Sequence, residues 1–179
     1  MIAGGLVTAP YGLPILPVDT FIKYDKILHL SRTVKVERES AGKLPQLYAD
    51  MFGWENLVAT VDKVYNSLAP EEKPKCAILA ENYGEAGAID FFGKSYNLPK
   101  SISAHNNYYL WGPGSYSGEV VIAVGYSEET LKSIFEQVEP AATILNEYAM
   151  PDAKQVSVYI CRGYKLSLQQ AWPSLKEYI

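Results

Sequence analysis

The stretch Glu119-Val120-Val121-Ile122-Ala123-Val124-Gly125 decides the fold. Its uninterrupted apolar run predicts a strand that is buried on both faces, and residues 75–80 predict a second strand of this kind. Other patterns alternate around them, with helices expected over 45–68, 84–96, 128–137 and 168–178 and strands over 101–104, 141–146 and 155–162. This alternation predicts an α/β fold, namely a three-layer, Rossmann-like arrangement in which helices cover both faces of a mostly parallel sheet.

The first 43 residues differ from the rest of the chain. Residues 1–18 are mostly apolar, but their three prolines would break a helix of the ~20 residues that a bilayer crossing needs. We interpret this segment as the end of a membrane helix, followed by a short amphipathic helix over 19–30 and a polar linker over 31–43. The sequence therefore predicts an N-terminal arm over 1–43 and a soluble α/β domain over 44–179. An arm that simply packs on the domain is the alternative interpretation.

Composition and charge limit the classes of function. The net charge of −4 argues against nucleic acid as a partner, because nucleic-acid binding needs clustered cations. Cys76 and Cys161 lie inside apolar runs, which favours two buried free thiols, with a disulfide as the alternative in an oxidising compartment. The two cysteines and two histidines have no metal-ligand spacing, so neither a metal nor a cofactor is expected.

The first candidate binding site directly follows the strand over 75–80. It comprises Asn82, Tyr83, Gly84, Glu85, Gly87 and Asp90. Ligands of open parallel sheets gather at the carboxyl ends of strands, where the N-terminus of a helix offers free N–H groups. The G-x-x-G spacing is neither a dinucleotide fingerprint nor a phosphate loop. The alternative is structural: the glycines shape a strand-to-helix turn, and Glu85 complements the helix dipole.

The second candidate follows the strand over 101–104 and is expected at the same edge of the sheet. It comprises His105, Asn106, Asn107, Tyr109 and Trp111. Asparagine amides offer paired donors and acceptors, and flat aromatic faces suit the apolar faces of sugar rings. This combination fits contact with a carbohydrate or glycolipid. The alternative is that Tyr109 and Trp111 fill the core beneath a long loop.

No reaction centre emerges from the residues. The sequence lacks the G-x-S-x-G, H-E-x-x-H and Walker motifs, and His105 has no partnered nucleophile. Glu81, Glu85 and Asp90 are candidates for paired carboxylates, but helical spacing points Glu85 and Asp90 to different faces. We therefore predict no catalytic residue, and whether this chain alone is an enzyme stays open.

Three longer motifs support a resemblance to a known family. They are Tyr-Ala-Asp-Met-Phe-Gly-Trp-Glu at 48–55, Asn-Tyr-Gly-Glu-Ala-Gly-Ala-Ile-Asp at 82–90 and His-Asn-Asn-Tyr-Tyr-Leu-Trp-Gly-Pro at 105–113. Shorter matches stand at 13–17, 161–162 and 172–176, so the similarity covers nearly the whole chain. The sequence resembles the C-terminal soluble domain of bacterial multi-spanning glycosyltransferases that use polyprenyl-phosphate sugars, relatives of the protein O-mannosyltransferases and lipid A aminoarabinose transferases.

The resemblance implies a location and a partner but no catalytic residue. In such enzymes the catalytic acid and the lipid-sugar site lie in an extracytoplasmic loop near the first membrane helices, and this sequence contains no such loop. The resemblance implies a domain at the extracytoplasmic face of the bacterial inner membrane. Its partner would be the membrane-embedded glycosyltransferase portion, in cis or as a separate chain, and a glycan or lipid-linked sugar its ligand.

Three functions follow as expectations. The first is a non-catalytic accessory domain that contributes acceptor or partner binding. The second is an independent module that binds a small ligand or anion at the helix N-terminus after Tyr83. The third is a structural domain that holds a partner through tyrosine and tryptophan patches.

Overall fold

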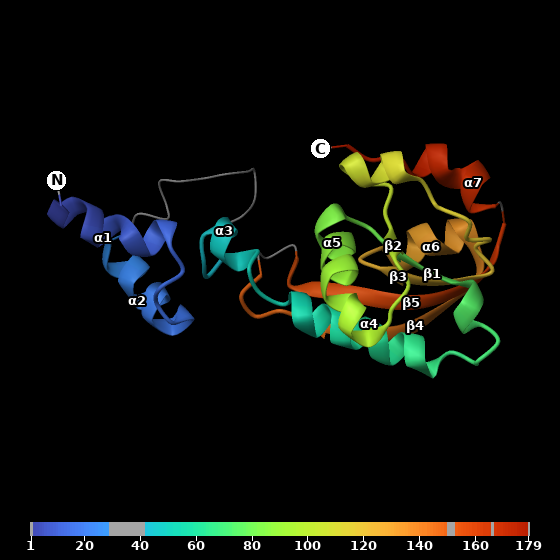
Figure 1. Ribbon diagram of the computed structural model, residues 1–179, viewed down its shortest axis with the longest axis horizontal. Coiled ribbons are helices and arrows are strands. Elements are labelled where there is room, and N and C mark those ends of the chain that lie inside the picture. The colour runs from blue at the N-terminus through green and yellow to red at the C-terminus, as the bar shows by residue number, and fades with distance from the viewer. Residues whose placement is uncertain (1, 29–41, 150–152, 166, 179) are drawn as a thin grey trace. The chain divides into compact units, whose positions relative to one another are not determined.

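The computed structural model describes residues 2–28, 42–149, 153–165 and 167–178 (Figure 1). The chain divides into two compact units. We call Met1–Gly53 together with Asn146–Lys154 the helical unit, and Trp54–Leu145 together with Gln155–Ile179 the α/β unit. The linker expected over 31–43 lies almost entirely outside the described residues.

The α/β unit contains a five-stranded mixed sheet in the order β2-β1-β3-β5-β4. The strands are β1 (Cys76–Ala80), β2 (Ser101–Ile102), β3 (Val120–Val124), β4 (Phe135–Leu145) and β5 (Gln155–Tyr164). The first three in the order pair in parallel, whereas β5 runs antiparallel to both β3 and β4. The predicted α/β class is confirmed, but the prediction of a mostly parallel sheet is wrong for the half formed by β4 and β5.

The helices of this unit are shorter than the sequence suggested. They are α4 (Trp54–Ser67), α5 (Tyr83–Phe92), α6 (Glu128–Ile134) and α7 (Leu168–Ala171), with 3-10 turns η2 (Lys73–Lys75), η3 (Gly93–Tyr96), η4 (Asn106–Trp111) and η6 (Trp172–Leu175). The helix expected over 84–96 becomes 3-10 from Gly93, and the one expected over 168–178 becomes 3-10 from Trp172. Beyond η6 the chain leaves helical geometry, and Glu177 forms a parallel bridge with His105.

The core explains why β1 and β3 occupy the centre of the sheet. Every residue of both strands is buried, as their apolar runs predicted. Side chains of β1 alternate between two clusters, so that Ile78 packs with α4 and α5 while Leu79 packs with Leu131 of α6 and Leu168 of α7. Each such aliphatic side chain contributes about 1.5–3 kcal/mol when it leaves water.

The edge strand β4 is the largest departure from the predicted elements. The helix expected to reach residue 137 ends at Ile134, and the strand expected over 141–146 already begins at Phe135. The pairing shifts register between Pro140 and Ala142, which places the proline at an irregularity of an edge strand. Proline, which has no backbone N–H, is tolerated there because an edge or irregular position need not donate a hydrogen bond to a neighbouring strand. Antiparallel pairing with β5 therefore outweighs the polar, proline-containing local sequence.

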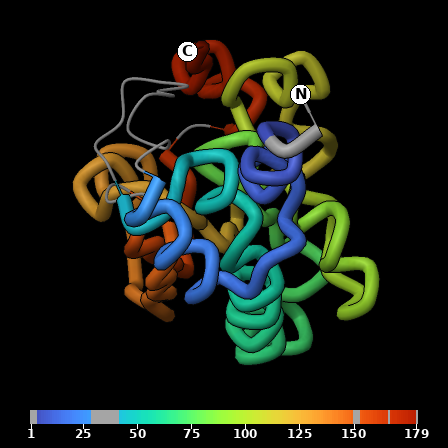
Figure 2. Tube along the Cα trace, turned by 90° about the vertical axis from the view of Figure 1, so that its left-hand side faces the viewer, coloured from blue at the N-terminus to red at the C-terminus, as the bar shows by residue number. Residues whose placement is uncertain are grey.

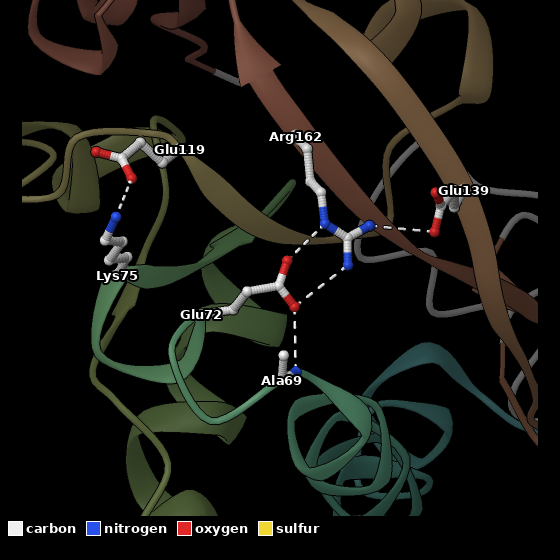
Figure 3. Close-up of polar contacts among 6 residues, drawn as sticks. All are labelled: Ala69, Glu72, Lys75, Glu119, Glu139 and Arg162. Carbon is white, nitrogen blue, oxygen red and sulfur yellow. Dashed lines mark hydrogen bonds and ion pairs between the residues drawn. The ribbon is translucent and has the colours of Figure 1, made fainter.

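A polar cluster ties the connection between α4 and β1 to the antiparallel strands (Figure 3). On β5, Arg162 donates from Nε to Oε1 of Glu72 at 2.7 Å and from Nη1 to Oε2 of Glu139 on β4 at 3.1 Å. Glu72 also accepts the backbone N–H of Ala69 at 3.1 Å. The hydrogen bond from Arg162 holds the pKa of Glu72 below its ordinary value, so this pair stays charged and anchors the connection.

The helical unit is built from α1 (Ile2–Gly12), α2 (Val18–Leu28) and α3 (Gln46–Ala49). Helices α1 and α2 follow each other along the chain and are drawn in blue in Figures 1 and 2. Phe21 stacks on Tyr48, with ring centroids 4.3 Å apart, and the Tyr48 hydroxyl donates to the carbonyls of Pro10 and Leu13. Among the described residues no helix is both long and apolar enough to cross a membrane.

The long helix expected over 45–68 is interrupted. Gly53 has a φ of +92°, a conformation that L side chains rarely adopt, and it separates α3 from α4. The expected start of the α/β domain, Leu44, is buried in the helical unit together with Tyr48 and Ala49. Leu44, Tyr48, Ala49 and Phe52 thus pack with the N-terminal helices, whereas Leu47 and Met51 of the same apolar pattern are exposed.

Candidate functional site

The N-terminus of α5 is closed by its own side chains. The Asn82 side chain accepts the N–H of Glu85 at 2.9 Å, and a Glu85 carboxylate oxygen accepts the N–H of Asn82 at 3.3 Å. The N–H of Tyr83 donates to Nδ1 of His105 at 3.3 Å. This arrangement is a capping box. Three amides that the anion-binding hypothesis would use therefore already have acceptors.

Glu85 is a buried carboxyl group with only 4% of its surface exposed. Burial raises its pKa to about 7, while the hydrogen bond with Asn82 opposes that rise and the charge of Glu81 adds to it. Next to it, Gly125 has a φ of +89°, and a Cβ there would lie 2.7 Å from Oε2 of Glu85. The close approach of β3 to α5 at this edge thus requires glycine.

The C-terminal segment contributes residues that the sequence did not single out. The N–H of Asn106 donates to the carbonyl of Glu177 at 2.8 Å, and the N–H of Glu177 donates to the carbonyl of Ala104 at 3.1 Å. Burial raises the pKa of Glu81, and the charge of Glu177 adds to it. Tyr126, two residues after the end of β3, is buried, and this burial together with the charges of Glu81 and Glu177 holds its pKa well above the ordinary value. Only the tertiary fold brings these side chains to one edge.

The two glycines of the first candidate are part of α5 and not of a turn. A Cβ on Gly84 would lie 3.1 Å from the indole of Trp54, whereas a Cβ on Gly87 would lie 3.8 Å from the Tyr108 hydroxyl. Neither glycine has a positive φ. The interpretation of these glycines as turn residues is therefore wrong, and the role of Gly84 is the close packing of α5 on α4.

Asp90 serves the fold. One of its carboxylate oxygens accepts both the N–H and the hydroxyl of Ser101, at 2.8 and 2.9 Å. The other accepts the hydroxyl of Tyr108 at 3.3 Å. The aspartate thereby joins α5, β2 and η4, and it does not pair with Glu85, whose carboxylate caps the helix. Together with the bond between Tyr83 and His105, this contact brings the two candidate motifs to one edge, as predicted.

His105 lies beneath this edge with 6% of its surface exposed. Its Nδ1 accepts from Tyr83, so a neutral ring carries its proton on Nε2. That nitrogen is buried and has no hydrogen-bond partner in the part of the chain that the structure describes. Asn106 follows with a φ of +50°, and Asn107 is exposed.

The two aromatic residues of the second candidate differ in their surroundings. Tyr109 stacks on Trp172 of η6, with ring centroids 6.0 Å apart, and its carbonyl accepts the indole N–H of Trp172 at 3.0 Å. Trp111 is 63% exposed. Its ring and that of Tyr108 lie edge to face, with their centroids 4.5 Å apart. The core-filling interpretation thus holds in part for Tyr109, whereas it is wrong for Trp111.

Lysine ammonium groups lie over the rings of this region. The ammonium of Lys100 lies 4.9 Å from the Trp111 ring centre, and that of Lys176 lies 5.3 Å from Tyr109 and 4.8 Å from Tyr178. We define the η4 surface by its exposed and half-buried residues: Tyr83, Asn107, Tyr108, Tyr109, Leu110, Trp111 and Tyr178. Ring faces, an amide and two ammonium groups are the chemistry that it offers a ligand.

Comparison with known proteins gives no match: no protein-family model, no curated protein and no solved structure is similar to this chain. The described residues also contain no group of three or more His, Cys, Asp or Glu side chains placed to hold a metal ion. Cys76 and Cys161 are both buried and free, as the apolar runs favoured, and burial raises the pKa of each thiol to about 12. Ligand binding by the candidate residues stays a prediction.

Proposed function

We propose that this chain is a non-catalytic accessory domain of a membrane glycosyltransferase that uses a lipid-linked sugar donor. In this proposal the η4 surface contacts the acceptor glycan or the membrane-embedded partner at the extracytoplasmic face of the bacterial inner membrane. The finer fold expectation, a three-layer Rossmann-like arrangement, belongs to the same proposal. The sequence motifs at 48–55, 82–90 and 105–113 support the proposed function, and they include most of the η4 surface.

The observation that carries the proposal is the exposure of Trp111. A tryptophan that leaves 63% of its surface in water gives up most of the stabilisation that burial would provide. Its ring is nevertheless held against Tyr108, and Lys100 lies over it. A flat apolar face with an ammonium donor over it suits a sugar ring, which has an apolar face and a polar rim.

The roles of the nearby acids support a binding function over a catalytic one. Glu85 caps α5, and Asp90 accepts from Ser101 and Tyr108. Both carboxyl groups therefore already stabilise the fold. The occupied amides of α5 also disfavour the anion-binding module, because a bound anion would have to displace Asn82 or His105 from them.

A titration of the full chain tests this proposal. Soluble mannose oligosaccharides, short-chain polyprenyl-phosphate mannose and the membrane-embedded partner are added in turn, and the Trp111 indole N–H resonance is followed by NMR. We expect this resonance to shift with a glycan or the partner. In the variant Trp111→Ala, which lacks this reporter, the backbone amide resonances of the remaining η4 surface should no longer shift. The free energy of unfolding should fall by less than about 1 kcal/mol, because the side chain is mostly exposed.

Tyr96→Ala is the matched control, since Tyr96 is an exposed aromatic residue on η3 outside the η4 surface. It should leave the response unchanged. A response to the partner alone would assign the η4 surface to partner contact and would refute its contact with the acceptor glycan. If none of the three additions moves a resonance of the η4 surface, the binding role is refuted.

A further inference from the structure

The helical unit exposes a set of aliphatic side chains that the proposed function does not use. Leu6 of α1 is 72% exposed, and Val7, Leu13 and Ile15 are exposed as well. The N–H of Leu13 donates to the carbonyl of Ala9 at 2.9 Å and so continues the helical pattern. Leu6 and Leu13, which are seven residues apart, therefore lie on one side of this helix. We call Leu6, Val7, Leu13 and Ile15 the α1 patch.

Other residues of α1 hold the helix within its unit. Pro10 is buried, and its carbonyl accepts the hydroxyl of Tyr48 of α3. The rings of Tyr11 and Phe21 lie edge to face, with their centroids 5.3 Å apart, and Phe21 is itself buried on α2. These contacts fix α1 on α2 and α3, so the α1 patch is the surface of a packed body.

The segment that carries the α1 patch has no charge. None of residues 1–18 has a charged side chain, and the hydroxyl of Thr8 donates to the carbonyl of Gly4 in its own helix at 3.1 Å. A helix that is apolar on all sides is normally buried in a protein core or in a membrane. Non-obligate protein interfaces, in contrast, are about as polar as the rest of a protein surface. The chemistry of the α1 patch therefore favours lipid over a transient protein partner.

Helix α2 supplies cations in the same unit. Lys23 and Lys26 are exposed, and neither has a carboxylate partner among the described residues. The acids of α2 are placed differently: Asp25 accepts the hydroxyl of Tyr11 at 2.8 Å, and Asp19 lies in the first turn, where it complements the helix dipole. Apolar side chains accompanied by lysines are typical of segments that lie on anionic membranes.

We infer that the helical unit docks on an anionic lipid bilayer through the α1 patch. The four aliphatic side chains enter the boundary between headgroups and acyl chains, and Lys23 and Lys26 interact with lipid phosphates. The sequence indicated only the end of a membrane helix, whereas the structure defines the side chains that meet the lipid. The inference stands apart from the proposed function, because it uses no residue of the η4 surface and needs no sugar.

The test is co-sedimentation of the full chain with phosphatidylcholine vesicles that contain phosphatidylglycerol. We expect the chain to bind, and the double variant Leu6→Ser/Leu13→Ser to bind at least tenfold more weakly. Lys23→Gln and Lys26→Gln should each weaken binding about fivefold, and neither should change binding to vesicles of phosphatidylcholine alone. Absence of binding, or unchanged binding by the leucine variant, would overturn the inference.

Leu145→Ser is the matched control, because Leu145 is 71% exposed but belongs to the α/β unit. It should leave vesicle binding unchanged. Thermal midpoints of all these variants should stay close to that of the wild type, since the altered side chains are exposed. A dimer in sedimentation velocity without lipid, lost in Leu6→Ser/Leu13→Ser, would assign the α1 patch to a second copy and refute lipid docking. The vesicles contain neither glycan nor partner, so this result is independent of the Trp111 titration.

Discussion

The buried carboxyl of Glu85 predicts a specific dependence of stability on pH. Its pKa rises from 4.5 to about 7 on folding, and at 1.36 kcal/mol for each pKa unit this difference corresponds to roughly 3 kcal/mol. The folded protein keeps the proton where the unfolded chain has lost it. The folded state therefore binds more protons between about pH 4.5 and 7, and the free energy of unfolding falls as the pH rises through this window.

The substitution Glu85→Gln should remove this dependence. Glutamine also serves at this position of a capping box, so it can still accept the N–H of Asn82, and it carries no charge. We expect the variant to match the wild type at about pH 4 and to exceed its free energy of unfolding by roughly 3 kcal/mol at about pH 8. Urea unfolding followed by tryptophan fluorescence measures both values.

Glu129→Gln is the control, because Glu129 is an exposed glutamate in the first turn of α6. Its difference from the wild type should be small and constant between about pH 5 and 8. Equal pH profiles for the wild type and Glu85→Gln would refute the argument, since they would mean that the carboxyl reaches water in the folded state.

Three further predictions concern the fold. A double-mutant cycle with Arg162→Met and Glu72→Gln should give a coupling of about 1 kcal/mol in urea unfolding, because the pair is mostly shielded from water; a coupling near zero would contradict this. Gly125→Ala should lower the free energy of unfolding by more than about 2 kcal/mol, whereas Gly112→Ala, with a positive φ but open space around it, should cost about 1 kcal/mol. Equal losses would show that the contact at Gly125 relaxes. Cys76 should react with a thiol reagent only as fast as the chain unfolds, since its thiol is buried and protonated; rapid labelling of the native protein would disprove this.

The elements that the sequence predicts well are those whose signal is local. The apolar runs of β1 and β3 are buried throughout, and α6 begins at Glu128, where the sequence predicted a helix to start. Only the second half of β4 was predicted, as the strand expected over 141–146, because the residues from Phe135 to Pro140 are mostly polar and have no strand signal of their own. Pairing with β5 creates that strand, and such pairing is a property of the whole sheet.

In the candidate site, too, the features that depend on contacts between distant segments could not be predicted from the sequence. Strand order alone predicted that the segments after β1 and β2 meet at one edge, and the bond between Tyr83 and His105 joins them there. The partners of Asp90 and the approach of Glu177 depend on contacts between segments far apart in the sequence. The exposure of Trp111 also could not be predicted, because an aromatic residue in a loop is equally compatible with a core position.

The division of the chain affects how the protein can be shortened or recombined. The backbone passes between the two units three times, after Gly53, after Leu145 and after Lys154. No single cut can therefore release either unit intact, and deleting residues 1–53 would strip Tyr148 of its contact with Phe52. A crossover that exchanged only the N-terminal segment would separate the 146–154 segment from the residues that it contacts in the helical unit. We therefore expect the two units to be inherited together. Expressing either unit alone would require a redesign of the 146–154 segment.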